Sequence, residues 1–276
     1  MIPFDFEYYQ PASIAEAVQL YNDLQQNGKA PMYYGGGTEI ITMARNSSIK
    51  TQAVIDIKQI PECQQLETKG QSLIIGAAVT LTAIAEANPF PLLTQAGSRV
   101  ADHSVQNKIT LGGNVCGTII YHEAVLPLLL ADSEVCISGI NESRTESIHT
   151  VFDQQMRLNN GELVVQFKIP LEYTSLPHWH VKKTKLEKID YPLITLCALK
   201  KDGAIRIALS GACSFPFRGR AMEKALNQPG EDLSKRVAQA LQQLPGPLQD
   251  TVAGSSNYRR FVLGNLLEDA IDGLEG

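Results

Sequence analysis

Three consecutive glycines, Gly35 to Gly37, stand between a strand-like and a helix-like stretch and constrain this chain more than any other feature. The preceding "APMYY" is β-prone, and the following "TEIITMARN" places Ile40, Ile41 and Met43 as the first turns of a helix require. Glycine has no Cβ, so several backbone N–H groups of such a turn can point toward one anion. The turn therefore either binds an anion or only reverses the chain.

The neighbouring elements predict a small α/β unit with a largely parallel sheet. "PASIAEAVQLYNDL" is an amphipathic helix, with Ser13 and Glu16 forming a capping box and Gly28 ending it. "QAVIDI" is a buried strand. From residue 71 the pattern repeats: a strand at 73–75, a turn at Gly76, a helix after Thr80 or Thr82, and a helix over 91–107. The repeat predicts a second α/β unit.

The segment after Pro170 changes character. "HWHVKKTKL", "DYPLITLCALKK" and "AIRIALSGACSF" are typical of successive antiparallel strands, and "KKDGAI" of the turn between the last two. Two helices follow, "EDLSKRVAQALQQL" and "NYRRFVLGNLLEDAI". We therefore predict an α+β chain with a ligand-binding domain over residues 1–170, divided into subdomains of about 1–60 and 61–170, and a C-terminal α+β domain over 171–276.

Composition excludes several classes of function. The longest apolar run is broken by Pro127 and Asp132, and the N-terminus lacks a basic region and an apolar core, so we expect neither a membrane span nor a signal peptide. A net charge of −5 with mixed signs argues against nucleic acid as a partner. The five cysteines are widely spaced, as expected of reduced thiols in a cytoplasmic protein.

Metal and catalytic side-chain patterns are also missing. His178 and His180 flank Trp179 without a third ligand nearby, which favours ordinary core or surface histidines. The spacing of the other histidines and the cysteines matches no nucleophile–base motif. We therefore expect no resident metal and no catalytic side chain, and chemistry, if any, that a cofactor supplies.

A second glycine pair resembles the first. "KITLGGNVCG" predicts a strand that runs into a turn, with Thr110, Leu111, Gly112, Gly113 and Asn114 in the order hydroxyl, glycines, amide. A helix beginning at Thr38 would add its positive N-terminal end to the first turn, while Glu39 would have to turn away from an anion, toward a hydroxyl. Neither turn fits a nucleoside triphosphate loop or the G-x-G-x-x-G fingerprint.

At this point the chain resembles the FAD-binding subunits of the xanthine dehydrogenase type of molybdenum hydroxylases, over nearly its whole length. The family motifs "P-x-F-x-Y-x-x-P-x-S", "A-G-G-T-D", "ID-I", "IGA-x-x-T-L" and "RN-x-x-T-I-GGN-x-C" occur in order as "PFDFEYYQPAS", "GGGTE", "IDI", "IGAAVTL" and "QNKITLGGNVC". "DYPLITLCA", "RIALSGACSFPFR" and "YRR" match later family stretches. The ordered set is far more specific than any single motif.

The resemblance implies a fold of the vanillyl-alcohol-oxidase and xanthine dehydrogenase type, with FAD between two α/β subdomains beside a third domain. It assigns the pyrophosphate to Met32, Tyr33, Tyr34, Gly35, Gly36, Gly37, Thr38 and Glu39, and to Thr110, Leu111, Gly112, Gly113 and Asn114. The side chains that the first three glycines omit would mark the space of the phosphates. Val164 would pack against the isoalloxazine, and Lys182 would lie near the ring edge or else, in a run of lysines, on a solvated face.

Two departures from the family pattern bear on the site. The family arginine before Asn107 is Gln106 here, and the family aspartate is replaced by Ala124. Whether the neighbouring Glu123 substitutes for that aspartate is open. Loss of one hydrogen bond to FAD would weaken binding by about 1 kcal/mol.

The resemblance also implies partners. Molybdopterin and iron–sulfur clusters would lie on a large and a small partner subunit, in an expected assembly of two copies of each subunit. Electrons would reach the FAD of this chain and leave to NAD or oxygen. Xanthine dehydrogenase of purine catabolism is the first expectation; the alternatives are nicotinate, carbon monoxide, an aldehyde or an aromatic thioester as substrate, or a non-catalytic α/β scaffold.

Overall fold

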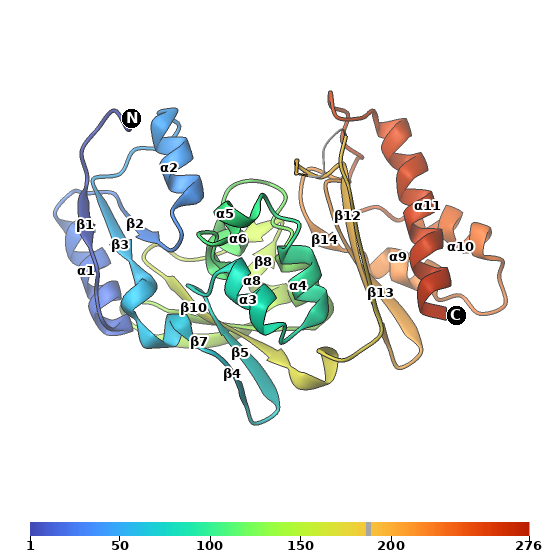
Figure 1. Cartoon of the computed structure of the whole chain (residues 1–276), viewed down its shortest axis with the longest axis horizontal. Helices are drawn as coiled ribbons and strands as arrows, with labels where there is room; N and C mark the ends of the chain where they lie inside the picture. The colour runs from blue at the N-terminus through green and yellow to red at the C-terminus, as the bar shows by residue number, and fades with distance from the viewer. Residues whose placement is uncertain (186–188, 276) are drawn as a thin grey trace.

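The computed structural model describes residues 1–185 and 189–275. Figure 1 shows three units side by side: an N-terminal sheet with helices beside it, a central sheet with short helices around it, and a C-terminal sheet covered by helices. This is the expected α+β class with a C-terminal antiparallel sheet and helices. None of the helices in the described ranges is long and apolar enough to cross a membrane.

The N-terminal unit has the predicted parallel sheet, in the order β1 (Glu7–Tyr9), β3 (Ala53–Asp56), β2 (Pro31–Tyr34). Between β1 and β2 lies α1 (Ile14–Gln26), where Ser13 accepts from the N–H of Glu16 and Glu16 accepts from the N–H of Ala12. β2 leads through the three glycines into α2 (Thr38–Arg45). The strand, glycine turn and helix are confirmed.

The central sheet has the order β4 (Leu66–Lys69), β5 (Ser72–Gly76), β10 (Leu163–Pro170), β6 (Glu134–Ser138), β7 (Ser143–Ser147), and every pair in it is antiparallel. The recurring sequence pattern predicted that this unit would repeat the parallel arrangement of the first one. That prediction is wrong. Short turns join β4 to β5 and β6 to β7, and such hairpins are necessarily antiparallel. β10 enters between the two hairpins from later in the chain.

Two predictions of secondary structure in this unit are wrong. The helix expected over 91–107 is two helices, α4 (Pro91–Gly97) and α5 (His103–Gln106), with Ala101 between them at a positive φ of 55°. The strand expected before the second glycine pair is absent, because the Thr110 hydroxyl accepts from the N–H of Gly113 and begins a helix, α6. The unit is completed by α3 (Leu81–Ala87), α6 (Leu111–Cys116), α7 (Val125–Leu130), α8 (Ile148–Val151), β8 (Phe152–Asp153), β9 (Gln155–Met156) and the 3₁₀ turns η1 (Ile57–Gln59), η2 (Pro61–Gln64) and η3 (Leu171–Tyr173).

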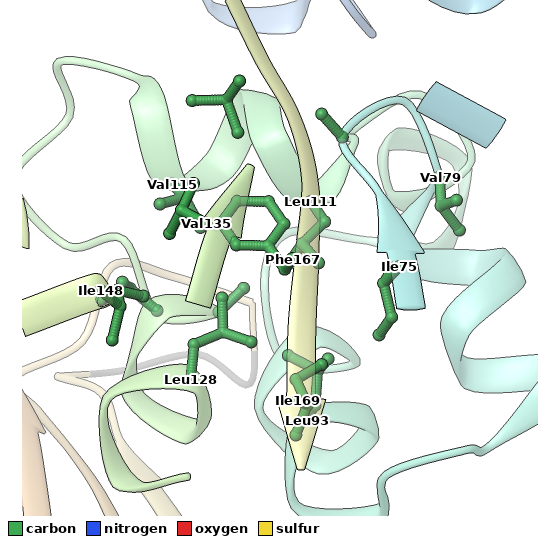
Figure 2. Close-up of a cluster of buried hydrophobic side chains, with 14 of the residues drawn as sticks. Ile75, Val79, Leu93, Leu111, Val115, Leu128, Val135, Ile148, Phe167 and Ile169 are labelled. Atoms are coloured by element: carbon green, nitrogen blue, oxygen red, sulfur yellow. The ribbon is translucent and has the colours of Figure 1, made fainter. Parts of the chain in front are cut away.

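The helices pack on the central sheet through one hydrophobic core, which extends into the N-terminal unit. Figure 2 shows Phe167 of β10 with Leu111 and Val115 of α6 and Val135 of β6 around it. Phe167 and Leu111 are completely buried. Burying a side chain of this size contributes about 1.5–3 kcal/mol, so this core fixes α6, and with it the second glycine pair, on the sheet.

The C-terminal unit is an antiparallel sheet in the order β11 (His178–Lys183), β12 (Ile194–Lys201), β13 (Ala204–Ser210), β14 (Phe217–Arg218). The predicted turn between β12 and β13 is formed by Asp202 and Gly203, both at positive φ. The predicted helices are α10 (Leu233–Ala240) and α11 (Ser256–Glu275); α9 (Arg220–Leu226) was not predicted. They cover a second hydrophobic core.

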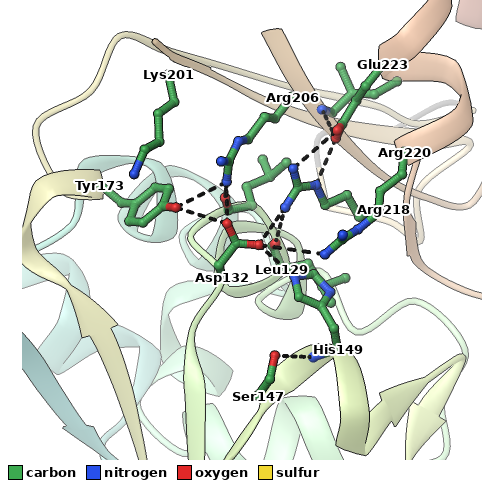
Figure 3. Close-up of polar contacts among 12 residues, drawn as sticks. Leu129, Asp132, Ser147, His149, Tyr173, Lys201, Arg206, Arg218, Arg220 and Glu223 are labelled. Atoms are coloured by element: carbon green, nitrogen blue, oxygen red, sulfur yellow. Dashed lines mark hydrogen bonds and ion pairs between the residues drawn. The ribbon is translucent and has the colours of Figure 1, made fainter. Parts of the chain in front are cut away.

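One carboxylate joins this unit to the central one. Asp132 follows α7, and its oxygens accept from Arg206 of β13 at 2.5 Å, Arg218 of β14 at 2.7 Å, His149 at 2.9 Å and Tyr173 at 2.9 Å. Figure 3 shows these side chains converging from both units. Burial opposes ionisation, but the hydrogen bonds from His149 and Arg206 and the charge of Arg218 prevail and hold the pKa of Asp132 well below its ordinary range.

We expect Asp132→Asn to lower the free energy of unfolding at pH 7 by about 1–2 kcal/mol, because it removes charge-assisted hydrogen bonds that solvent partly screens. The folded-state pKa of Asp132 is depressed, so its contribution is present above about pH 4 and is lost as the pH falls further. Urea denaturation from pH 7 to pH 3 measures both effects. Asp153→Asn, which breaks an exposed ion pair with Arg157, is the control and should change little. An equal loss in both variants would contradict the assignment.

Candidate functional site

A cavity of about 760 Å³ lies where the three units meet. Its wall comes from β2, the glycine turn and α2, from the stretch between Val100 and Glu123, and from Lys182 and Ile189 to Tyr191 of the C-terminal unit. Cavities of ~300–1,000 Å³ hold small molecules and cofactors. The site is therefore built jointly by all three units.

Eleven of the fifteen residues that the sequence assigned to ligand binding line this cavity: Met32, Tyr33, Gly35, Gly36, Gly37, Thr38, Glu39, Thr110, Gly113, Asn114 and Lys182. Four do not. Gly112 and Val164 line a smaller cavity of about 110 Å³, which shares five lining residues with the large one: Tyr33, Gly35, Thr110, Gly113 and Cys116. Leu111 is in the core, and Tyr34 lies against Gly37.

The first glycine turn presents unpaired donors. Within the described residues, the N–H groups of Gly36, Gly37, Thr38, Glu39 and Ile40 donate to no acceptor; the first intrahelical bond runs from Ile41 to Gly37. The N-cap residue Gly37 has no side chain to satisfy them. These donors border the cavity at the positive end of α2, which is the chemistry of an anion site.

Lys58 supports the turn from outside the cavity wall. Its ammonium donates to the carbonyl of Gly35 at 2.8 Å and to Asp56 at 2.6 Å. Asp56 is buried and also accepts from the hydroxyl of Tyr8. The Lys58 charge lies 4.7 Å from the centre of the Tyr34 ring. Asp56 and Tyr34 thus support the turn without facing the cavity.

The three glycines have a different role from the one expected. A Cβ on Gly36 would lie 1.5 Å from the carbonyl oxygen of Lys108, one on Gly35 would lie 2.6 Å from the Thr110 hydroxyl, and one on Gly37 would overlap the Tyr34 ring. The omitted side chains therefore mark protein contacts and not ligand space. Their absence lets the turn pack directly on the segment 108–110.

The second glycine pair does not offer a second set of backbone donors. The N–H groups of Leu111, Gly112, Gly113 and Asn114 donate to Val79, Ala77, the Thr110 hydroxyl and the Thr110 carbonyl, at 2.9 to 3.1 Å. A Cβ on Gly112 would lie 2.6 Å from that of Ala77. The expectation of two equivalent anion cradles is therefore wrong: this pair serves helix packing and forms a wall of the cavity.

Glu39 turns away from the donors, as expected. Its carboxylate accepts from the N–H of Thr118 at 2.6 Å and from the Thr118 hydroxyl at 2.8 Å. Asn114 fixes the continuation of that loop, accepting from the N–H of Ala124 at 3.1 Å, while its carbonyl lies 2.8 Å from Nδ1 of His122. Burial lowers the pKa of His122. Glu39 and Asn114 thus order the loop 117–124.

The interpretation of Lys182 as a solvated lysine is wrong, because its side chain is 1% exposed. Its ammonium donates to Glu123 at 2.9 Å and to the carbonyl of Arg99 at 2.8 Å. The other Glu123 oxygen accepts from the Thr195 hydroxyl at 2.6 Å. Both Glu123 oxygens are thus bound within the protein, which leaves Glu123 a poor substitute for the family aspartate at Ala124.

Sequence reasoning missed the aromatic part of the wall. The rings of Tyr121 and Tyr191 stack with centroids 4.8 Å apart and lie beside Ile119 and Ile189. Tyr191 belongs to "DYPLITLCA", a stretch that matches a family motif. Its pairing with Tyr121, seventy residues earlier, leaves no pattern in the local sequence that could predict it. The cavity thus combines anion donors at one wall with an aromatic and aliphatic surface elsewhere.

The side chains of the cavity are poorly suited to catalysis by themselves. Burial raises the pKa of the Cys116 thiol to about 12, so it is not a thiolate nucleophile. Glu123 and Lys182 are paired with each other. No cluster of metal-ligating side chains occurs among the residues the structure describes. The geometry fits a bound cofactor that carries the chemistry.

The family model described as the FAD binding domain in molybdopterin dehydrogenase matches residues 4–172, well over half of the chain. The chain belongs to the FAD-binding medium subunits of the molybdenum hydroxylase family. The expected fold type is confirmed with it.

Relatives align along nearly the whole length of the chain. The carbon monoxide dehydrogenase medium chain of Hydrogenophaga pseudoflava is 26% identical over 99% of this chain and 98% of its own. The nicotinate dehydrogenase FAD-subunit of Eubacterium barkeri is 28% identical over 99% and 98%, and the caffeine dehydrogenase subunit beta of a Pseudomonas species 25% over 95% and 92%. A solved structure of the Hydrogenophaga carbon monoxide dehydrogenase, lacking the Mo-pyranopterin moiety of its molybdenum cofactor, superimposes with a TM-score of 0.86 at 24% identity, covering 100% of this chain and 99% of that one.

We expect Gly36→Ala to lower the free energy of unfolding by about 1–3 kcal/mol, because its Cβ would collide with the Lys108 carbonyl and force the glycine turn off the segment 108–110. Chemical denaturation of both proteins measures the change. Gly264→Ala is a matched control within α11, where the nearest atom to the new Cβ is 3.6 Å away, and it should be neutral or stabilise by up to ~1 kcal/mol. Equal changes in the free energy of unfolding for the two variants would show that the contact between Gly36 and Lys108 does not stabilise the fold.

Proposed function

We propose that FAD binds in the large cavity with its pyrophosphate at the glycine turn. The observation that carries this proposal is the row of unpaired N–H groups from Gly36 to Ile40 at the start of α2. A pyrophosphate satisfies several such donors at once and is favoured by the helix dipole without a lysine. The size of the cavity and its aromatic wall suit the remainder of a dinucleotide.

The proposed contacts divide by position. Met32, Tyr33, Gly35, Gly36, Gly37, Thr38, Glu39, Thr110, Gly113, Asn114 and Lys182 line the cavity and border the ligand. Three further residues do not border the large cavity and support its wall only by packing: Tyr34, Leu111 and Gly112. Val164 reaches the ligand only from the smaller adjoining cavity, where we place the edge of the isoalloxazine.

We propose that the chain is the electron-transfer subunit of an oxidoreductase complex. Bound FAD supplies the exchange between single electrons and a hydride. The protein binds and orients the cofactor. Partner subunits would hold the molybdenum centre and the iron–sulfur clusters, with two copies of each subunit in a cytoplasmic assembly, and NAD would be the acceptor.

For the whole complex we propose xanthine dehydrogenase activity in purine catabolism. The similarity to a caffeine dehydrogenase subunit supports a purine substrate, since caffeine is a purine. Nicotinate, carbon monoxide, an aldehyde or an aromatic thioester are the alternatives, and the relatives named for the first two are 28% and 26% identical to this chain, against 25% for the caffeine dehydrogenase subunit. Because the substrate would bind a partner subunit, the compound that reduces the flavin of the native complex decides among them.

We expect the purified chain to bind one FAD and to prefer FAD over FMN by at least tenfold in Kd, about 1.4 kcal/mol, because FMN offers one phosphate where FAD offers a pyrophosphate. Fluorescence titration of the apoprotein measures both affinities. Failure to bind added FAD would contradict the proposal and favour a scaffold.

The matched variant for this titration is Gly113→Val. A Cβ on Gly113 meets only the Thr110 hydroxyl, at 2.9 Å, so the added methyl groups would extend into space shared by the two cavities. The variant should stay folded and lose FAD affinity at least tenfold. Wild-type affinity in this variant would place the cofactor elsewhere.

We expect NADH to reduce the FAD of the isolated holoprotein, because the nicotinamide reaction would need only this subunit. Anaerobic stopped-flow absorbance measures the rate. Dithionite, which reduces flavins without transferring a hydride, serves as the control donor that shows the bound FAD can be reduced. A holoprotein that NADH leaves oxidised, while the intact complex is reduced by its substrate, would exclude NAD as the acceptor.

A further inference from the structure

The buried pair of Glu123 and Lys182 joins two units at the cavity wall. Their side chains are 5% and 1% exposed, and the two atoms Oε2 and Nζ are 2.9 Å apart. Glu123 lies in the loop before α7, whereas Lys182 and Thr195 are directly opposite each other on β11 and β12. The C-terminal sheet therefore binds the Glu123 carboxylate of the central unit through the ammonium of Lys182 and the hydroxyl of Thr195.

The lysine has one donor without an acceptor among the described residues. An ammonium group has three N–H bonds, and within the described residues Lys182 donates to two acceptors, Glu123 and the carbonyl of Arg99. Lys182 and Glu123 both line the cavity. Whatever binds there thus meets a cation whose charge the neighbouring carboxylate offsets.

We propose that Glu123 is a positioning residue that holds the Lys182 ammonium at the cavity wall and offsets its charge, and so sets how readily bound FAD accepts electrons. This inference rests on the proposed binding of FAD in this cavity. A nearby positive charge stabilises reduced flavin, which carries more negative charge than oxidised flavin, and a negative charge does the opposite. The effect is strong where water is excluded.

Three isosteric or nearly isosteric variants separate this role from a purely structural one. Glu123→Gln leaves the Lys182 charge uncompensated and should raise the midpoint potential of bound FAD. Lys182→Met should lower it. The double variant removes both charges and should return the potential toward the wild-type value; replacing both members of a buried pair by neutral groups is often tolerated. Shifts of opposite sign are not expected from loss of packing.

The potentials are measured by dye equilibration on the FAD-loaded chain, with the FAD content and thermal unfolding of each variant recorded. We expect Glu123→Gln to change the ratio of reduced to oxidised FAD at least tenfold, about 30 mV for a two-electron couple. Glu172→Gln, which breaks an exposed pair with Lys201, is the control and should leave the potential unchanged.

A folded, FAD-loaded Glu123→Gln variant with the wild-type potential would overturn the inference and leave the proposed function intact. Failure of the wild-type chain to bind FAD would overturn both. If Glu123→Gln alone does not fold, the comparison moves to the double variant: a folded, FAD-binding double variant supports the pairing of charges, and an unfolded one assigns Glu123 a structural role and overturns the inference.

Discussion

The rest of the site depends on the contact between the glycine turn and the segment 108–110. The carbonyl of Lys108 lies where a side chain of residue 36 would begin, so two backbones from different units touch directly. That approach places the start of α2 in the wall of the cavity, where its first N–H groups have no acceptor among the described residues. Any bulk at this point would separate the units and open the cavity.

The two glycine pairs look alike in sequence but differ in physical role. The N–H groups at the first remain available because Gly37 cannot cap the helix with a side chain. At the second, Thr110 caps α6 and neighbouring carbonyls accept the other N–H groups. A capping threonine in place of a glycine, together with the carbonyls of Val79 and Ala77, thus separates a structural helix start from a candidate ligand site.

Local sequence was sufficient for the strand, turn and helix around residues 31–45, since propensity and glycine act at short range. It was also sufficient for the C-terminal hairpin, whose Asp202–Gly203 turn has a specific signature. It failed where tertiary contacts decide: the antiparallel central sheet, the space around the three glycines, and the burial of Lys182 beside Glu123. The family resemblance placed most of the proposed ligand residues around one cavity, but the stacked pair of Tyr121 and Tyr191 needed the structure.

The central position of β10 has a consequence for folding order. β10 lies between two hairpins, β4–β5 and β6–β7, that the chain completes before residue 163. Until it arrives, each hairpin presents an open edge, and the loops carried by this unit have no fixed sheet beneath them. The sheet that supports the cavity therefore depends on pairing between segments far apart in the sequence, and such pairing costs more chain entropy to form than either local hairpin.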